Sequence, residues 1–171
     1  MGRPENDRLA AELLRAAAEI EHLREYHLPG FLGAVDRFYA PLDELLTRVR
    51  AGDADAIEPA LRFLEVDPRC FRSGYFKADL LHALAHAPDL AAARQRVQQV
   101  VAPRLLQCEP RLWRHTVRLA AAVWDDAFEA RVAAMFTEAH APEASIDELR
   151  ATIRHLRESD AGRGVAPRSG P

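Results

Sequence analysis

The organisation of this chain is decided in one stretch, Phe63-Leu-Glu-Val-Asp-Pro-Arg-Cys-Phe-Arg-Ser-Gly-Tyr-Phe-Lys77. Asp67-Pro68 predicts the end of a helix, because a proline disfavours helical geometry in the residue before it. Ser73 predicts the start of the next helix, since serine is a preferred N-cap residue. The residues between these two positions include cations and aromatic rings, although the residues of loops between helices are mostly small and polar. The stretch therefore predicts a structured turn between two helices with a role of its own.

The composition outside this stretch favours an all-α protein with a single domain. Its 171 residues suit one sizeable core, and 49% apolar with 29% charged residues is a globular balance. Only 8 residues are glycine, while the strong helix formers Ala, Leu, Arg and Glu recur throughout. We predict one helical domain over 1–158. The segment 159–171 has no apolar face to bury, and we expect it to be a disordered tail.

Apolar residues at helical spacing predict about eight helices. The expected segments are roughly 6–27, 31–49, 55–66, 73–84, 89–105, 110–123, 126–136 and 145–156. Pro41 and Pro103 fall inside two of them. Each is expected to kink or divide its helix, because proline lacks the backbone N–H and clashes with the preceding turn.

Helix pairs recur about every 35–40 residues, over 31–66, 73–108 and 111–139, and periods of this size are typical of helical solenoids. In helix lengths and turn spacing, the chain from Phe31 to Ala139 resembles HEAT-like helical repeats. The resemblance implies antiparallel pairs stacked in an α-α superhelix. The Val-Arg pair and the aspartate ladder of such repeats are not evident, so an irregular helical bundle is the alternative.

The net charge of −3 hides a segregation along the chain. Residues 1–66 hold 13 acids and 8 bases, residues 67–123 hold 4 acids and 9 bases, and residues 124–158 hold 8 acids and 4 bases. A basic middle lies between acidic ends, which predicts a local positive field in a protein that is acidic as a whole.

The basic middle contains the candidate partner-binding residues. Arg111, Arg114 and Arg118 are spaced i, i+3 and i+7, which places them in one stripe on a helix. The full candidate set is Arg69, Arg72, Tyr75, Lys77, Arg111, Arg114 and Arg118. The alternative is a solvated face with acids nearby in space, because charged runs usually serve solvation.

Signals for chemistry are sparse. Asp79, His82 and His86 share one helical face and are candidate metal ligands, although a face beside the core explains them equally. No Gly-x-Ser-x-Gly motif and no glycine-rich phosphate loop is present. Cys70 and Cys108 make neither a disulfide framework nor a zinc pattern. We therefore expect no catalytic residue and no cofactor.

Three functional hypotheses follow. The leading one is a non-enzymatic helical-repeat module, an adaptor or an immunity-type inhibitor, that binds a protein partner, such as the product of a neighbouring gene, through its basic middle. The second is nucleic-acid binding by the same surface, against which the isoelectric point near 6.2 counts. The third is a metal-binding helical enzyme that uses Asp79, His82 and His86.

The expected location is the cytoplasm. The N-terminus lacks the apolar region of a signal peptide, and no apolar run approaches 18 residues, so no membrane partner is expected. Arginine is used almost to the exclusion of lysine, since Lys77 is the only lysine. This bias, together with the high alanine content, suggests a bacterial source.

Overall fold

The computed structural model describes residues 3–88, 90–141 and 143–163, and this part of the chain contains helices and no strand. The prediction of an all-α fold with eight helices is confirmed. The elements are α1 (Arg3–Glu25), α2 (Phe31–Arg50), the short 3-10 helix η1 (Ala54–Ala56), α3 (Ile57–Val66), α4 (Ser73–Ala85), α5 (Arg94–Gln107), α6 (Trp113–Ala122), α7 (Asp126–Glu138) and α8 (Glu143–Arg163). No described helix is both long and apolar enough to cross a bilayer.

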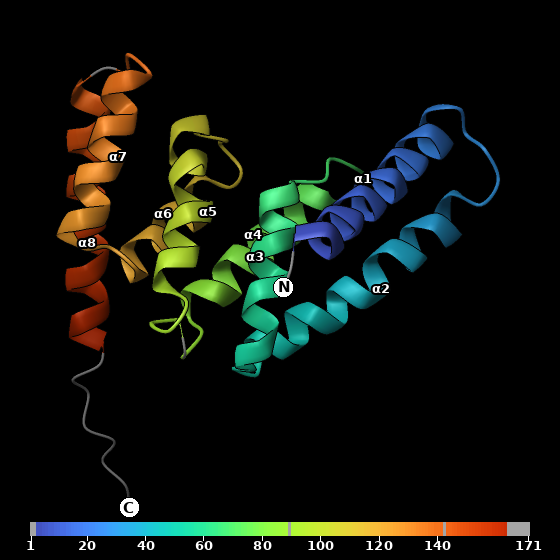
Figure 1. Cartoon of the computed structure of the whole chain (residues 1–171), viewed down its shortest axis with the longest axis horizontal. Coiled ribbons are helices and arrows are strands. Elements are labelled where there is room, and N and C mark those ends of the chain that lie inside the picture. The colour runs from blue at the N-terminus through green and yellow to red at the C-terminus, as the bar shows by residue number, and fades with distance from the viewer. Residues whose placement is uncertain (1–2, 89, 142, 164–171) are drawn as a thin grey trace, which may run out of the picture.

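The helices form two rows along an elongated molecule, with α1 and α2 at one end and α7 and α8 at the other (Figure 1). In one row α2 packs on α4, α4 on α6, and α6 on α8. In the other row α1 packs on α3, α3 on α5, and α5 on α7. Contacts between α1 and α2, α3 and α4, α5 and α6, and α7 and α8 join the rows.

The pairing of the helices differs from the prediction. Of the expected pairs, α2 and α3 are in contact, whereas α4 does not contact α5 and α6 does not contact α7 among the described residues. The physical reason is that α4 is already enclosed by α2 and α6 in its own row. Apolar faces therefore decide which helices pair, and the short connections between neighbours in sequence do not.

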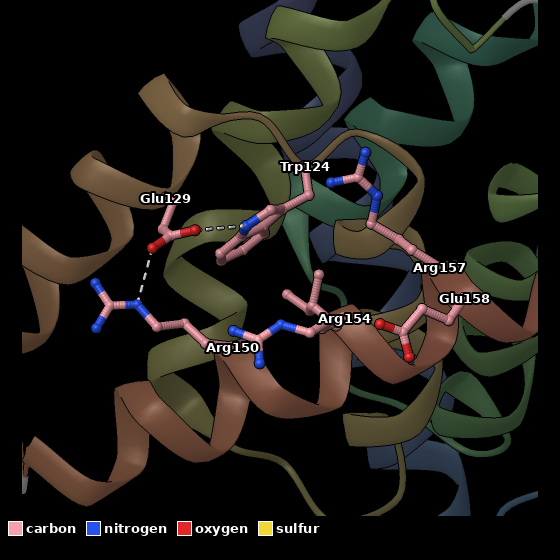
Figure 2. Close-up of a pocket in the computed structure, with 7 residues that line it drawn as sticks. Trp124, Glu129, Arg150, Arg154, Arg157 and Glu158 are labelled. Atoms are coloured by element: carbon pink, nitrogen blue, oxygen red, sulfur yellow. Dashed lines mark hydrogen bonds and ion pairs between the residues drawn. The ribbon is translucent and has the colours of Figure 1, made fainter.

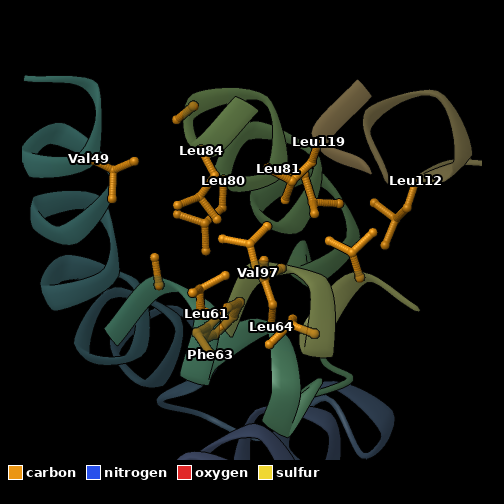
Figure 3. Close-up of a cluster of buried hydrophobic side chains, with 14 of the residues drawn as sticks. Val49, Leu61, Phe63, Leu64, Leu80, Leu81, Leu84, Val97, Leu112 and Leu119 are labelled. Atoms are coloured by element: carbon orange, nitrogen blue, oxygen red, sulfur yellow. The ribbon is translucent and has the colours of Figure 1, made fainter. Parts of the chain in front are cut away.

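The buried apolar side chains form one cluster that runs through both rows. Figure 3 shows its middle, where Leu64 of α3, Leu81 of α4 and Val97 of α5 lie with Leu119 of α6. All four side chains are almost completely excluded from water. Burying a leucine of this kind contributes about 2 kcal/mol, so the seam between α4 and α6 is a principal source of stability.

One alternative for the two prolines is excluded, and one helix boundary needs correction. Pro41 and Pro103 do not divide their helices, because α2 continues to Arg50 and α5 to Gln107. Both prolines are exposed, so the carbonyl that each leaves unbonded is on the solvent side. The final helix also extends to Arg163, so residues 159–163 are helical and not part of a tail. The remaining tail residues, 164–171, lie outside the described residues.

Candidate functional site

The turn between α3 and α4 is held by hydrogen bonds to α1 and to α2. Asp67 ends α3 in the left-handed conformation, with φ 52° and ψ 50°. The backbone N–H of Phe71 donates to Glu21 Oε1 of α1 at 2.6 Å, and its carbonyl accepts from the hydroxyl of Tyr39 in α2 at 2.6 Å. The turn is therefore structured, as the sequence predicts, and it is held by the two helices of the neighbouring hairpin.

The phenol of Tyr39 and the thiol of Cys70, which lie under the turn, are unreactive. Burial raises the pKa of the Tyr39 phenol and the pKa of the Cys70 thiol, so both are neutral near pH 7. Their oxygen and sulfur atoms lie 3.7 Å apart in a neutral hydrogen bond. A thiol that stays protonated is a poor nucleophile, and Cys70 has a packing role. Cys108, in contrast, is exposed.

Lys77, one of the predicted partner-binding residues, is buried and does not lie on the exposed surface. Its side chain is 4% exposed, and its Nζ lies 2.7 Å from Asp67 Oδ1. Arg104 of α5, 8% exposed, donates to the same oxygen at 3.1 Å and also to the carbonyl of Leu64. Burial raises the pKa of Asp67, but the two cations outweigh it and the net pKa is lowered. The three charges form a structural ion-pair cluster.

The other residues of the turn face solvent and line a large hollow. Arg69, Arg72 and Tyr75 are exposed, with Tyr75 exposed to 70%. A hollow of about 990 Å³ lies between them and the segment before α6, which contributes Glu109 and Arg111. The sequence predicts a surface shared by the turn and the arginine stripe, and the structure places these residues around one space.

Two smaller hollows adjoin the first along α4 and α6. One, of about 450 Å³, shares Tyr75 and Arg111 with it and adds Trp113 and Arg114. The other, of about 420 Å³, shares Trp113 and Arg114 and adds Arg118. We call the run of three hollows the basic groove. The predicted residues that line it are Arg69, Arg72, Tyr75, Lys77, Arg111, Arg114 and Arg118, of which Lys77 is buried.

Four arginines of the basic groove lack a carboxylate partner among the described residues, and three of them, Arg72, Arg111 and Arg114, are exposed, whereas Arg118 is half-buried. Within the described part of the chain, none of Arg72, Arg111, Arg114 and Arg118 forms an ion pair with a carboxylate. Arg96, outside the groove, is bound by Glu58 at 3.0 Å and by Glu65 at 2.8 Å. The groove arginines thus remain available to an external anion.

His82 of α4 lines the groove, and His86 follows the end of that helix, but the two do not form a metal site with Asp79. The rings of His82 and His86 are 4.5 Å apart, and the ring of His115 in α6 lies 6.1 Å from His82. His86 Nδ1 is 2.8 Å from the carbonyl oxygen of His82. Among the described residues, no group of three or more His, Cys, Asp and Glu side chains is arranged to hold a metal ion.

A separate hollow of about 310 Å³ lies between the start of α7 and α8, and sequence reasoning missed it. Figure 2 shows Trp124 donating through Nε1 to Glu129 at 3.2 Å, and Glu129 accepting from Arg150 at 2.9 Å. Arg154 and Arg157 also line it. The i, i+4, i+7 spacing of the three arginines on α8 was the available signal. The indole N–H of Trp124 is hydrogen-bonded to the Glu129 carboxylate within the protein, which indicates a structural role for Trp124.

In comparisons with protein-family models, with curated proteins and with solved structures, nothing matches the chain. The functional argument therefore depends on the geometry of the basic groove.

Proposed function

We propose that the protein is a non-enzymatic helical-repeat module that binds an acidic surface of a protein partner through the basic groove. The observation that carries the proposal is that four arginines without a carboxylate partner among the described residues line one run of hollows. Unpaired charges of one sign attract a complementary surface and accelerate association. The HEAT-like α-α superhelix is part of this proposal, and the two rows of helices support it.

The aromatic residues of the groove support a protein partner. Tyr75 is exposed, Trp113 is half-buried, and both lie between arginines. Tyrosine, tryptophan and arginine are the residues that most often dominate the binding energy of protein interfaces. The hydrogen bonds that anchor Phe71 also fix the turn before binding, which lowers the entropic cost of association.

The class of partner follows from these features. An adaptor or an immunity-type inhibitor of the bacterial cytoplasm acts by occupying an acidic surface of another protein, and it needs no catalytic residue. The groove offers cations and aromatic rings on a rigid helical scaffold, which is suited to that role.

The test is a charge reversal with a matched control. The triple variant Arg111→Glu, Arg114→Glu, Arg118→Glu is compared with Arg8→Glu, Arg15→Glu, Arg37→Glu, which carries the same charge change on exposed positions of α1 and α2. Partners are captured from the native host, identified, purified and measured by calorimetry. We expect the groove variant to weaken binding by about 100-fold or more and the control by less than about threefold. Equal affinities for the two variants would refute the proposal.

Nucleic acid is the second candidate, because Tyr75 and Trp113 among arginines also fit stacked bases. Glu21 and Glu109 also line the groove and oppose any anion. A phosphate backbone is charged at every nucleotide, whereas an acidic protein surface can place uncharged side chains opposite these two carboxylates, which favours the protein partner. In a gel-shift experiment at low salt with single- and double-stranded DNA and RNA, we expect no shift. A salt-dependent shift that the groove variant abolishes would replace the protein partner by nucleic acid.

A further inference from the structure

The hollow at the α8 end of the basic groove differs from the other two. Its floor is apolar, built from Val117 and Trp113 of α6 and from Leu156 of α8. Its rim carries the cations Arg114 and Arg118 of α6, together with the imidazoles of His82 and His115. A pocket with an apolar floor and a cationic rim binds an amphipathic anion better than it binds a bare charge.

His82 is neutral at neutral pH in the unbound protein. Its pKa is lowered, first by burial and then by the cations around it, which are His86, Arg118 and Arg50 of α2. Asp79 acts in the opposite direction and does not compensate. The ring consequently gains its proton at a lower pH than an unperturbed histidine does.

His115 behaves in the same way from the facing helix. Its pKa is lowered first by burial, then by Arg114 and His82, with a smaller effect of Arg118, and Asp79 opposes the shift. The groups that α8 contributes to the hollow, Thr152 and Leu156, are uncharged. Both histidines therefore face an environment that is short of negative charge.

We propose that this hollow receives a carboxylate side chain of the partner together with an adjacent aromatic or aliphatic side chain, and that His82 and His115 make this contact tighter in mild acid. The inference rests on the proposed function, because it specifies the partner chemistry at one end of the basic groove. The argument for this occupant is complementarity of charge at the rim and of apolar surface at the floor.

Proton linkage explains the pH dependence. A carboxylate placed beside the imidazoles stabilises their charged form and raises their pKa, so the complex takes up protons that the unbound protein does not hold. Between about pH 7.5 and about pH 5.5 we expect affinity to rise about threefold to tenfold, which corresponds to two partly exposed ion pairs.

The experiment uses the full chain and synthetic peptides of equal length. A peptide of alternating Glu and Phe is compared with one of Glu and Ser and one of Gln and Phe, and binding is followed by NMR titration at the two pH values. The Glu–Phe peptide should bind most tightly, shift the resonances of His82, His115 and Leu156, and gain affinity in acid. The Gln–Phe peptide should bind weakly, with no gain in acid.

The double variant His82→Gln, His115→Gln isolates the histidines. It should keep the affinity of the native chain at about pH 7.5, where both rings are neutral, and lose the gain in acid. The control His22→Gln, at an exposed position of α1, should keep that gain.

The outcomes separate the two proposals. Binding of the Glu–Phe peptide that depends on Arg111 but leaves Leu156 unperturbed, or a gain in acid that persists in the double variant, overturns this inference and leaves the proposed function standing. Absence of binding by both acidic peptides overturns this inference too, and the charge-reversal experiment with the captured partner then decides the proposed function separately.

Discussion

Asp67 has two roles, because it ends helix α3 and its side chain binds residues of two other helices. It adopts the left-handed conformation that ends α3, which aspartate tolerates better than most residues. Its carboxylate binds Lys77 from the next helix and Arg104 from α5. Arg104 also donates to the carbonyl of Leu64, where a cation is favoured by the helix dipole. One acidic residue thus joins three helices.

The contribution of this ion-pair cluster to stability can be tested by removing Lys77, which is buried, and comparing the result with the removal of Arg69, which is exposed and lies near the same carboxylate. We expect Lys77→Met to lower the free energy of unfolding by about 1–3 kcal/mol, because Asp67 then keeps one buried partner instead of two. The control is Arg69→Met, whose side chain is 85% exposed and 3.7 Å from the same carboxylate, with a change below about 0.5 kcal/mol. Urea denaturation at neutral pH measures both, and equal losses would contradict the structural role of Lys77.

At the scale of the elements, α3 and α5 are linked by Arg96, which binds Glu58 and Glu65. The hydrogen bond from Arg96 is the main reason that the pKa of Glu65 falls from 4.5 to about 2. A carboxyl group whose pKa is depressed by folding stabilises the protein above its unfolded pKa, and this contribution is lost as the pH falls through its folded pKa.

Thermal unfolding as a function of pH tests this link. We expect the melting temperature to drop between about pH 4.5 and about pH 2, partly because Glu65 must be protonated. The variant Glu65→Gln should be less stable at neutral pH and should show a shallower drop. Glu138→Gln, at an exposed position of α7, is the control. If the two variants have the same pH profile, the link between α3 and α5 contributes nothing measurable.

The seam between α4 and α6 is the second feature at this scale. Leu119→Ala removes a fully buried side chain that lies beside Leu81 in Figure 3. We expect a loss of about 3 kcal/mol, since the cavity left in a packed interior adds to the lost burial. Leu32→Ala, at a side chain that is 71% exposed, should cost less than about 0.5 kcal/mol. A Leu119→Ala variant as stable as the native chain would disprove the importance of the seam.

At the scale of the whole molecule, the two rows make the ends less buried than the middle. Among its described side chains α1 buries Ala17 and Ile20, and α8 buries Leu149 and Ile153. In contrast, α4 lies between α2 and α6 and buries most of its apolar residues. Proteins built from stacked helices gain stability from neighbour contacts, so a helix with one neighbour in its row opens more easily.

Hydrogen exchange followed by mass spectrometry tests this gradient. We expect the slowest exchange in α3 to α6, and faster exchange in the first half of α1 and in α8, because local opening there exposes little apolar surface. Uniform protection along the chain would instead show that the two rows unfold as one cooperative unit.

The sequence by itself determined the class of the fold and the place of its positive charge. Helix formers and apolar periodicity are local properties, so the all-α class and most helix bounds follow from them, whereas the start of α5 and the end of α8 do not. All seven predicted partner-binding residues line the basic groove, although Lys77 is buried, because the i, i+3, i+7 stripe and the crowded turn are also local.

Only the tertiary structure decided how these parts meet. In the folded protein α4 packs beside α6, and Lys77 is buried. Lys77 and Arg104 bind the same carboxylate of Asp67, and Arg104 is 37 residues from Asp67 in the chain. These outcomes depend on which apolar faces fit and on which buried charges find a partner. Both are contacts between segments far apart in sequence, which spacing along one helix does not encode.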